Sequence, residues 1–115
     1  MVIADRLKTM GTVWTPRTRH PFYEGIIMKI VAFYEMAPDA LPKVMTYFPA
    51  HRVRLDEFHA RGVLIAAGPL GNPPESAMAI FTTRAAAEEF IEGDPFVING
   101  LVSKWRLFEW NAAFI

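Results

Sequence analysis

The chain shows its clearest hydrophobic pattern from residue 28 onward. Short apolar segments typical of strands alternate there with longer segments that have the spacing of a helix, and turn-forming residues separate them. Residues 28–35 form a short apolar segment without Gly or Pro, which predicts a strand. Residues 41–61 carry apolar side chains at helical spacing and are followed by Gly62, so this segment predicts a helix. The residues of its apolar stripe are Val44, Phe48, Leu55 and Phe58. Pro49 lies inside the segment and indicates a break or a new helix start.

The rest of the pattern contains three more predicted strands and a second helix. The strands are expected at residues 63–68, 77–82 and 102–110, with a loop at 69–76 and a helix at 84–92. Thr83 is placed to cap this helix, and Asp94-Pro95 begins a short turn or a single helical turn. The order β-α-β-β-α-β predicts an α+β, ferredoxin-like antiparallel sheet with two helices on one face.

The predicted strands are apolar on both faces. In the first strand Ile30 and Ala32 fall on one face, and Val31 and Phe33 fall on the other. A sheet with one face in water would alternate apolar and polar residues instead. Because two helices cover only one face, we expect a second copy of the chain to cover the other, sheet against sheet, as a homodimer. The alternative is that the N-terminal residues fold back over this face.

Residues 1–27 differ from the rest, because they mix Thr, Arg, Gly and Pro and show no sustained period of a strand or a helix. We expect them to form an N-terminal extension. A secretory signal is not expected, since no apolar core of roughly seven residues or more follows Arg6 and Lys8. Met28 stands directly before the first predicted strand, so the domain is expected at residues 28–115.

Composition excludes several classes of protein. A chain of 115 residues holds one domain, and a hydrophobic content of 52% is too high for a disordered chain. The 12 Lys and Arg balance the 12 Asp and Glu, so no basic surface is expected to bind nucleic acid or an anionic membrane. The absence of Cys excludes disulfides and thiol catalysis and favours a cytoplasmic location. The longest apolar stretch, residues 63–70, is far shorter than the roughly 20 residues of a membrane-spanning helix.

His51 and Asp94 are the residues best suited to acid–base chemistry. His51 lies on the apolar stripe between Phe48 and Leu55. This position fits either a buried His bonded to a backbone carbonyl or a proton-transfer residue in a cleft. Asp94 precedes Pro95 and suits a helix cap, yet a carboxylate can also orient an imidazole and stabilise its protonated form. The two form the best dyad that the sequence offers, although spacing alone does not bring them together.

The sequence contains few other candidates for a metal, a cofactor or a catalytic charge. His51 and His59 are eight positions apart, with no carboxylate at the usual metal-site spacing. Residues 68–71 lack the pattern of a phosphate-binding loop, and no Gly-x-Ser-x-Gly elbow supports a serine hydrolase. Arg54 and Arg61 are expected on the solvated face of the first helix. We therefore expect no metal and no cofactor.

Four short motifs carry a resemblance to a known family. They are Pro49-Ala50-His51-x-x-Arg54-Leu55, Gly62-x-Leu64-x-x-Ala67-Gly68-Pro69, Ala86-Ala87 and Asp94-Pro95-Phe96-x-x-x-Gly100-Leu101-Val102. In this order and spacing, residues 28–115 resemble the YCII-related (YciI-like) family. The resemblance implies a ferredoxin-like domain that pairs into a dimeric α+β barrel, in agreement with the homodimer expected from the two apolar sheet faces.

The resemblance also implies a site and an activity. It singles out His51 and Asp94 as the His–Asp pair of an active site. Its relatives include a dehydrochlorinase of a chlorinated, hydroxylated aromatic ring and, more distantly, muconolactone isomerases, which move protons without a cofactor. We therefore expect a cofactor-independent lyase or isomerase of a small aromatic or enol-type molecule. His51 would move the proton and Asp94 would hold its tautomer. The alternative is a non-catalytic dimeric module that binds a small molecule or is associated with stress.

Four further residues are expected to bind the substrate. Gly68 and Pro69 would shape the rim of the cleft, because the backbone of a glycine can approach a ligand closely. Ser76 is a candidate for a hydrogen bond to the substrate. Phe96 stands where the family often has Tyr, so a hydroxyl that would assist binding or chemistry is missing there.

Overall fold

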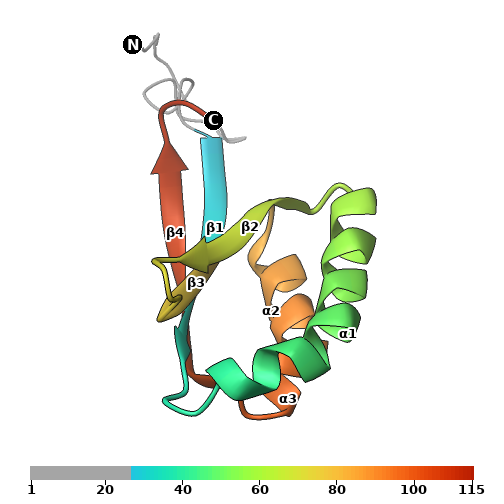
Figure 1. Ribbon diagram of the computed structural model, residues 1–115. Helices are drawn as coiled ribbons and strands as arrows, with labels where there is room; N and C mark the ends of the chain where they lie inside the picture. Colours follow the sequence, from blue (N-terminus) through green and yellow to red (C-terminus); the bar gives the residue numbers. More distant parts are fainter. Residues whose placement is uncertain (1–26) are drawn as a thin grey trace, which may run out of the picture. The chain divides into compact units, whose positions relative to one another are not determined.

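The computed structural model describes residues 27–115, and the extension expected over residues 1–27 lies outside this part except for its last residue. The described residues form four strands and three helices (Figure 1). In chain order they are β1 (Ile27–Met36), α1 (Leu41–Ala60), β2 (Leu64–Leu70), β3 (Ser76–Phe81), α2 (Arg84–Gly93), α3 (Pro95–Ile98) and β4 (Val102–Ala112). The predicted order of strands and helices is confirmed, with Asp94-Pro95 opening the short helix α3.

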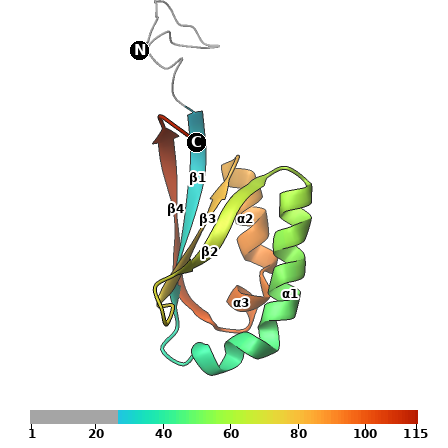
Figure 2. The same ribbon diagram turned by 45° about the horizontal axis from the view of Figure 1, so that its top comes forward.

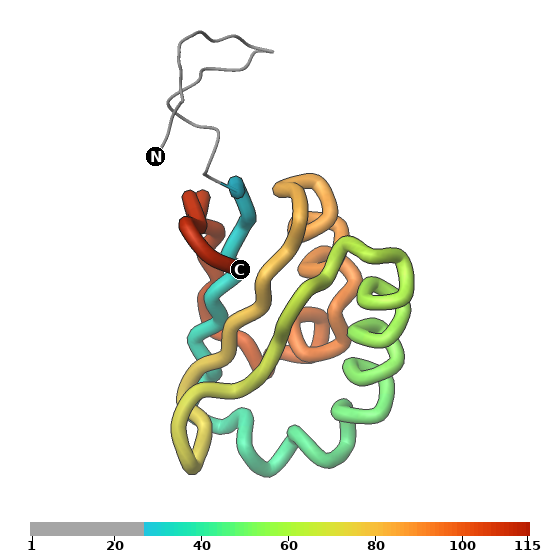
Figure 3. Tube along the Cα trace, turned by 90° about the horizontal axis from the view of Figure 1, so that it is seen from above, coloured from blue at the N-terminus to red at the C-terminus, as the bar shows by residue number. Residues whose placement is uncertain are grey.

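The strands form one antiparallel sheet in the order β2-β3-β1-β4, which is the ferredoxin-like arrangement predicted from the sequence. Both long helices lie on the same face of this sheet (Figures 1 and 2). Seen from above, β1 and β3 run through the centre, and β2 and β4 form the edges (Figure 3). Among residues 27–115, helices therefore cover one face of the sheet and leave the other uncovered.

Strand register decides which side chains face the helices. Ala32 pairs with Ala79 and Tyr34 pairs with Ala77, so these four residues share one face. Ala32 and Tyr34 are buried, whereas Phe33 between them is only half-buried, because it points to the face that no helix covers. The helix-covered face holds the core. Its largest buried members are Phe58, Phe81 and Phe90, with Phe90 packed edge-to-face on Phe58 at 5.2 Å between ring centroids.

The face without helices is also apolar, as predicted. Phe108 of β4 is 44% exposed. The guanidinium of Arg106 lies over two aromatic rings, at 5.9 Å from the centroid of Phe33 and 5.2 Å from that of Phe108. Exposed aromatic side chains on a sheet face are typical of a surface that meets a partner.

Two expectations about prolines were wrong. Helix α1 continues through Pro49 and bends instead of breaking, as Figure 1 shows between its first and later turns. The carbonyl that Pro49 leaves without an intrahelical donor belongs to Met45, whose 83% exposure lets water satisfy it. Strand β2 includes Pro69, which the sequence placed in a loop. An edge strand tolerates proline because one side of its backbone needs no hydrogen-bond partner.

Candidate active site

Asp94 lies at the junction of α2 and α3, and its side chain is fully buried, with 0% exposure. Its Oδ1 accepts the backbone N–H of Phe96 at 3.1 Å, which confirms the predicted cap of the short helix. Pro95 occupies the first position of α3, where its missing N–H costs nothing. The helix cap thus holds the carboxylate of Asp94 in the interior of the protein. Further hydrogen-bond donors are needed there to compensate for its lost hydration.

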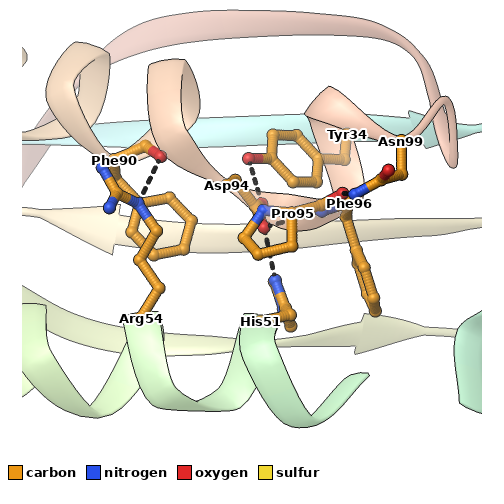
Figure 4. Close-up of polar contacts among 8 residues, drawn as sticks. All are labelled: Tyr34, His51, Arg54, Phe90, Asp94, Pro95, Phe96 and Asn99. Carbon is orange, nitrogen blue, oxygen red and sulfur yellow. Dashed lines mark hydrogen bonds and ion pairs between the residues drawn. The ribbon is translucent and has the colours of Figure 1, made fainter. Parts of the chain in front are cut away.

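His51 supplies one of these donors from the middle of α1. Its Nδ1 lies 2.7 Å from Asp94 Oδ1, and its side chain is 13% exposed (Figure 4). The structure therefore brings together the two residues that the sequence could not place. A carboxylate oxygen accepts and does not donate, so the bond puts the proton of the neutral imidazole on Nδ1. Nε2 is then an unprotonated acceptor, which is the state that a general base requires.

Tyr34 is a third member of the site, and sequence reasoning missed it. Its hydroxyl donates to Asp94 Oδ2 at 2.7 Å (Figure 4). Burial, followed by the charge and the hydrogen bond of Asp94, raises the pKa of Tyr34 above its usual range, so the phenol remains a donor. The sequence contained one signal for this bond, namely a tyrosine at a strand position that faces the core. A buried phenol usually has a polar partner. Within residues 27–115, the carboxylate of Asp94 accepts three donors, from Tyr34, Phe96 and His51.

Aromatic rings fix the plane of the imidazole. Phe96 stacks on His51 with 3.9 Å between ring centroids and 2° between ring planes. Phe90 meets His51 edge-on at 6.2 Å, and Phe48 lies tilted at the same distance. Phe96 also lines the cavity described next, so its contact with His51 adds a positioning role to the substrate contact that the sequence predicted. The ring of His51 has little freedom to leave the carboxylate.

A cavity of about 560 Å³ opens beside His51, between α1 and the strands β2 and β3. This volume is within the usual range for small-molecule sites. Most of its walls are apolar or aromatic, and the polar side chains among the lining residues are Tyr34, His51, Arg52, Asp56, His59 and Ser76. The proposed base, His51, therefore lies beside a space that a small ring-shaped molecule can fill.

The predicted substrate-binding residues on β2 and β3 also line this cavity. At Gly68 an added Cβ would meet nothing within 4 Å, so packing within the chain does not require a glycine there. Pro69 pairs with Ala77, on the face that carries Tyr34. Ser76 pairs with Glu35, so alternation along β3 directs its Cβ to the opposite sheet face from Ala77. Ser76 is therefore a weaker candidate than His51 for a hydrogen bond to the substrate.

Three polar residues of α1 also line the cavity, and sequence reasoning did not identify them as cavity residues. Arg52 and Asp56 form an exposed i,i+4 ion pair at 3.1 Å, and His59 lies near them. Within residues 27–115 no group of three or more His, Cys, Asp or Glu side chains is placed to hold a metal ion. No helix in this part of the chain is long and apolar enough to cross a membrane.

The expectation of a solvated side chain was wrong for Arg54, which is half-buried, whereas Arg61 is exposed as expected. Arg54 donates to two backbone carbonyls at the end of α2, those of Glu89 and Phe90. Arg61 forms a two-pronged salt bridge with the side chain of Glu89, at 2.9 and 3.1 Å. This pairing raises the pKa of Arg61 and lowers that of Glu89, the hydrogen bond being the largest cause of each shift. Helical periodicity predicts which residues lie off the apolar face of a helix. It does not predict which carbonyl groups or acidic side chains of another helix they bind.

Comparison with known proteins gives both the family and the fold. Protein YciI of Escherichia coli and that of Shigella flexneri are each 32% identical to this chain over 85 residues, covering 64% of this chain and 87% of theirs. A 5-chloro-2-hydroxyhydroquinone dehydrochlorinase of Burkholderia phenoliruptrix, solved in complex with 2,5-dihydroxybenzoquinone, has a similar fold. Its TM-score is 0.61 at 18% identity, with 72% of this chain and 93% of that chain covered. The family model of the YCII-related domain matches residues 28–111, so the chain belongs to the YCII-related family.

Proposed function

We propose that this protein is a cofactor-independent lyase or isomerase that moves a proton on a small aromatic or enol-type molecule. The observation that carries the proposal is the 2.7 Å bond from His51 Nδ1 to the fully buried carboxylate of Asp94 beside an apolar cavity. This bond leaves Nε2 as the basic nitrogen available to a bound molecule. Asp94 also stabilises the imidazolium that forms when Nε2 accepts a proton.

In the proposed step, Nε2 of His51 removes a proton from an O–H or C–H bond of the substrate. The electron pair of that bond moves into the ring system. In a lyase, the ring carbon that bears the halide takes up a proton, and the halide then leaves with its bonding electron pair as a second hydroxyl loses its proton, so that the overall change is loss of one proton and one halide ion. In an isomerase, His51 returns the proton to a different carbon. Neither route needs an electron acceptor. A positioned acid or base of this kind contributes about 10²–10⁴-fold to the rate.

Cavity chemistry supports the substrate class. Phe96 and Phe90 present ring surfaces near His51, and aromatic walls favour a flat apolar molecule. Arg52 is the lining residue with a permanent positive charge, and Asp56 already neutralises it. A strongly anionic substrate would therefore lose its hydration with little in return. The related dehydrochlorinase, which binds a hydroxylated benzoquinone, supports the same choice of ring compounds for a first screen.

The proposed working form is a homodimer in which the uncovered sheet faces of two copies pack together. The aromatic side chains of Phe33 and Phe108 support this arrangement, because burial against a partner would remove their exposed area from water. The cavity lies on the other face of the sheet, next to α1. Dimerisation would thus stabilise the sheet without filling the site.

A substrate screen with two histidine variants tests the function. The purified protein is incubated with chlorinated and hydroxylated hydroquinones, and release of chloride and formation of quinone are measured together. We expect turnover by the wild type, a loss of about 10²–10⁴-fold in His51→Ala, and a much smaller change in the control His59→Ala. His59 lines the same cavity from the same helix but has no bond to Asp94. Full turnover by His51→Ala would exclude the proposal, and tight binding without turnover by the wild type would favour the non-catalytic module.

A further inference from the structure

Arg54 links α1 to the segment that carries Asp94. It lies one helical turn after His51, and its Nε donates to the carbonyl of Phe90 at 3.0 Å (Figure 4). Its Nη2 donates to the carbonyl of Glu89 at 2.7 Å. The last carbonyls of a helix have no intrahelical donor and carry partial negative charge. A guanidinium fork suits this place, because it offers two N–H groups and a permanent positive charge.

Gly93 provides the space that the guanidinium needs. A Cβ added at this position would lie 2.6 Å from both Cζ and Nη2 of Arg54, which is closer than real Cβ contacts come. The backbone of Gly93 is not in the left-handed region, so conformation alone does not demand glycine there. An alanine at position 93 would therefore displace the guanidinium of Arg54, and Asp94 is the next residue in the chain.

We propose that the contact between Arg54 and Gly93 is a positioning device that holds Asp94 in register with His51. Adjacent turns of α1 carry His51, which contacts the carboxylate, and Arg54, which holds the end of the helix before that carboxylate. Arg54 does not line the cavity, so it acts through Asp94 and not on the substrate. The expected effect of Arg54 on catalysis rests on the proposed function. Its expected effect on the geometry of the His51–Asp94 pair does not.

Arg61 offers a matched control. It lies two turns further along α1, and its guanidinium also approaches the ring of Phe58 and the helix α2. It binds the side chain of Glu89, however, and not the backbone next to Asp94. Arg61→Ala thus removes the same charge and a similar contact between the same two helices without releasing the last turn of α2.

The first measurement is the tautomer of His51, read from the ¹⁵N chemical shifts of its ring in labelled protein. In the wild type and in Arg61→Ala we expect the proton on Nδ1. In Arg54→Ala we expect a loss of this preference, with both tautomers populated. An unchanged tautomer in Arg54→Ala would overturn the positioning role. A wild type with its proton on Nε2 would instead contradict the proposed base, so the two failures are distinguishable.

The second measurement is a double-mutant cycle with Gly93→Ala. Alone, this substitution should lower Tm by about 4–8 °C or more, because the methyl group displaces the guanidinium. In the Arg54→Ala background it should leave Tm unchanged or raise it, since the obstacle is gone and alanine suits a helix better than glycine. Equal losses in both backgrounds would overturn the proposed contact. If Arg54→Ala does not fold, Arg54→Lys replaces it in both measurements, because lysine keeps the charge but not the two-pronged fork.

With an identified substrate, the same variants give a kinetic readout. Arg54→Ala should lower kcat by about 10²-fold with little change in KM, because a misplaced base slows the chemical step without altering the cavity walls. Arg61→Ala should leave both constants close to those of the wild type. A rise in KM at constant kcat in Arg54→Ala would contradict positioning and indicate a direct role in binding.

Discussion

The hydroxyl of Tyr34 donates to Oδ2 of Asp94 at 2.7 Å, although 60 positions separate the two residues in the chain. The other oxygen of the same carboxylate accepts from His51. A central strand, the long helix and the start of α3 therefore meet at one buried group. Each donor that Asp94 receives lowers the cost of keeping its charge away from water.

Removal of this donor should destabilise the fold. In Tyr34→Phe the ring still fills its place in the core, but Oδ2 of Asp94 loses a partner, and a hydrogen bond to a charged group contributes about 1.5–3 kcal/mol. We expect the free energy of unfolding, measured by urea denaturation, to fall by that amount. Tyr47→Phe is the control, because Tyr47 is a half-buried tyrosine of α1 that is not among the donors to Asp94. An equal loss in both variants would assign the effect to the loss of a tyrosine hydroxyl in general and not to the bond with Asp94.

Stability should also depend on pH in the alkaline range through Tyr34. Its pKa is raised in the folded state, mainly by burial, so the folded protein keeps a proton that the unfolded chain releases above about pH 10. The contribution is complete below that pH and is lost as the pH rises further. The free energy of unfolding of the wild type should therefore decrease above about pH 10 more steeply than that of Tyr34→Phe. Parallel curves for the two proteins would contradict the raised pKa.

Asp94→Asn should abolish activity while changing the shape of the site very little. An amide can still accept the N–H of Phe96, but its NH₂ group would face either Tyr34 or His51, which both donate in the wild type. If it faces His51, the imidazole proton moves to Nε2 and the base is lost, an effect worth about 10⁴-fold in a comparable dyad. Turnover of the screened substrate measures this loss. Asp39→Asn, at an exposed acid paired with Lys43, controls for the change in net charge.

The sequence predicted the order of strands and helices because turn and capping residues act locally. Gly62, for example, ends α1 with a φ of 80°, which a glycine adopts readily. Asp94 could be predicted as a cap for the same reason. Its contact with His51 could only be proposed, because 43 positions separate the two residues and local sequence patterns do not predict contacts over that separation.

Tyr34 and Arg54 were missed for two different physical reasons. The bond of Tyr34 depends on which strand residues face the helices, and this follows from the register of β1 with β3 and not from β1 alone. Arg54 lies off the apolar stripe of α1, where a charged residue is normally solvated. Its partners are backbone carbonyls of another helix, which no side-chain pattern reveals.

The proposed homodimer can be tested by placing a charge on the sheet face that the helices leave uncovered. By light scattering we expect the wild type to have twice the mass of one chain, and Phe33→Asp to have the mass of one, because paired sheets would bury two carboxylates. Val53→Asp is the control, since Val53 is 59% exposed on α1. Circular dichroism of each variant checks that it is folded. A monomeric wild type, or a dimeric Phe33→Asp, would exclude this interface.

Gly68→Ala should separate ligand binding from folding at the rim of the cavity. An added Cβ there meets nothing within 4 Å, so the free energy of unfolding should stay constant or rise by about 0.4–1 kcal/mol. The methyl group would stand where a bound ring approaches the backbone, so the Kd for a hydroxylated benzoquinone, measured by titration, should increase. Gly62→Ala is the opposite control: its φ of 80° makes it destabilising, while the site stays intact in the folded fraction. An unchanged Kd in Gly68→Ala would remove Gly68 from the substrate-binding residues.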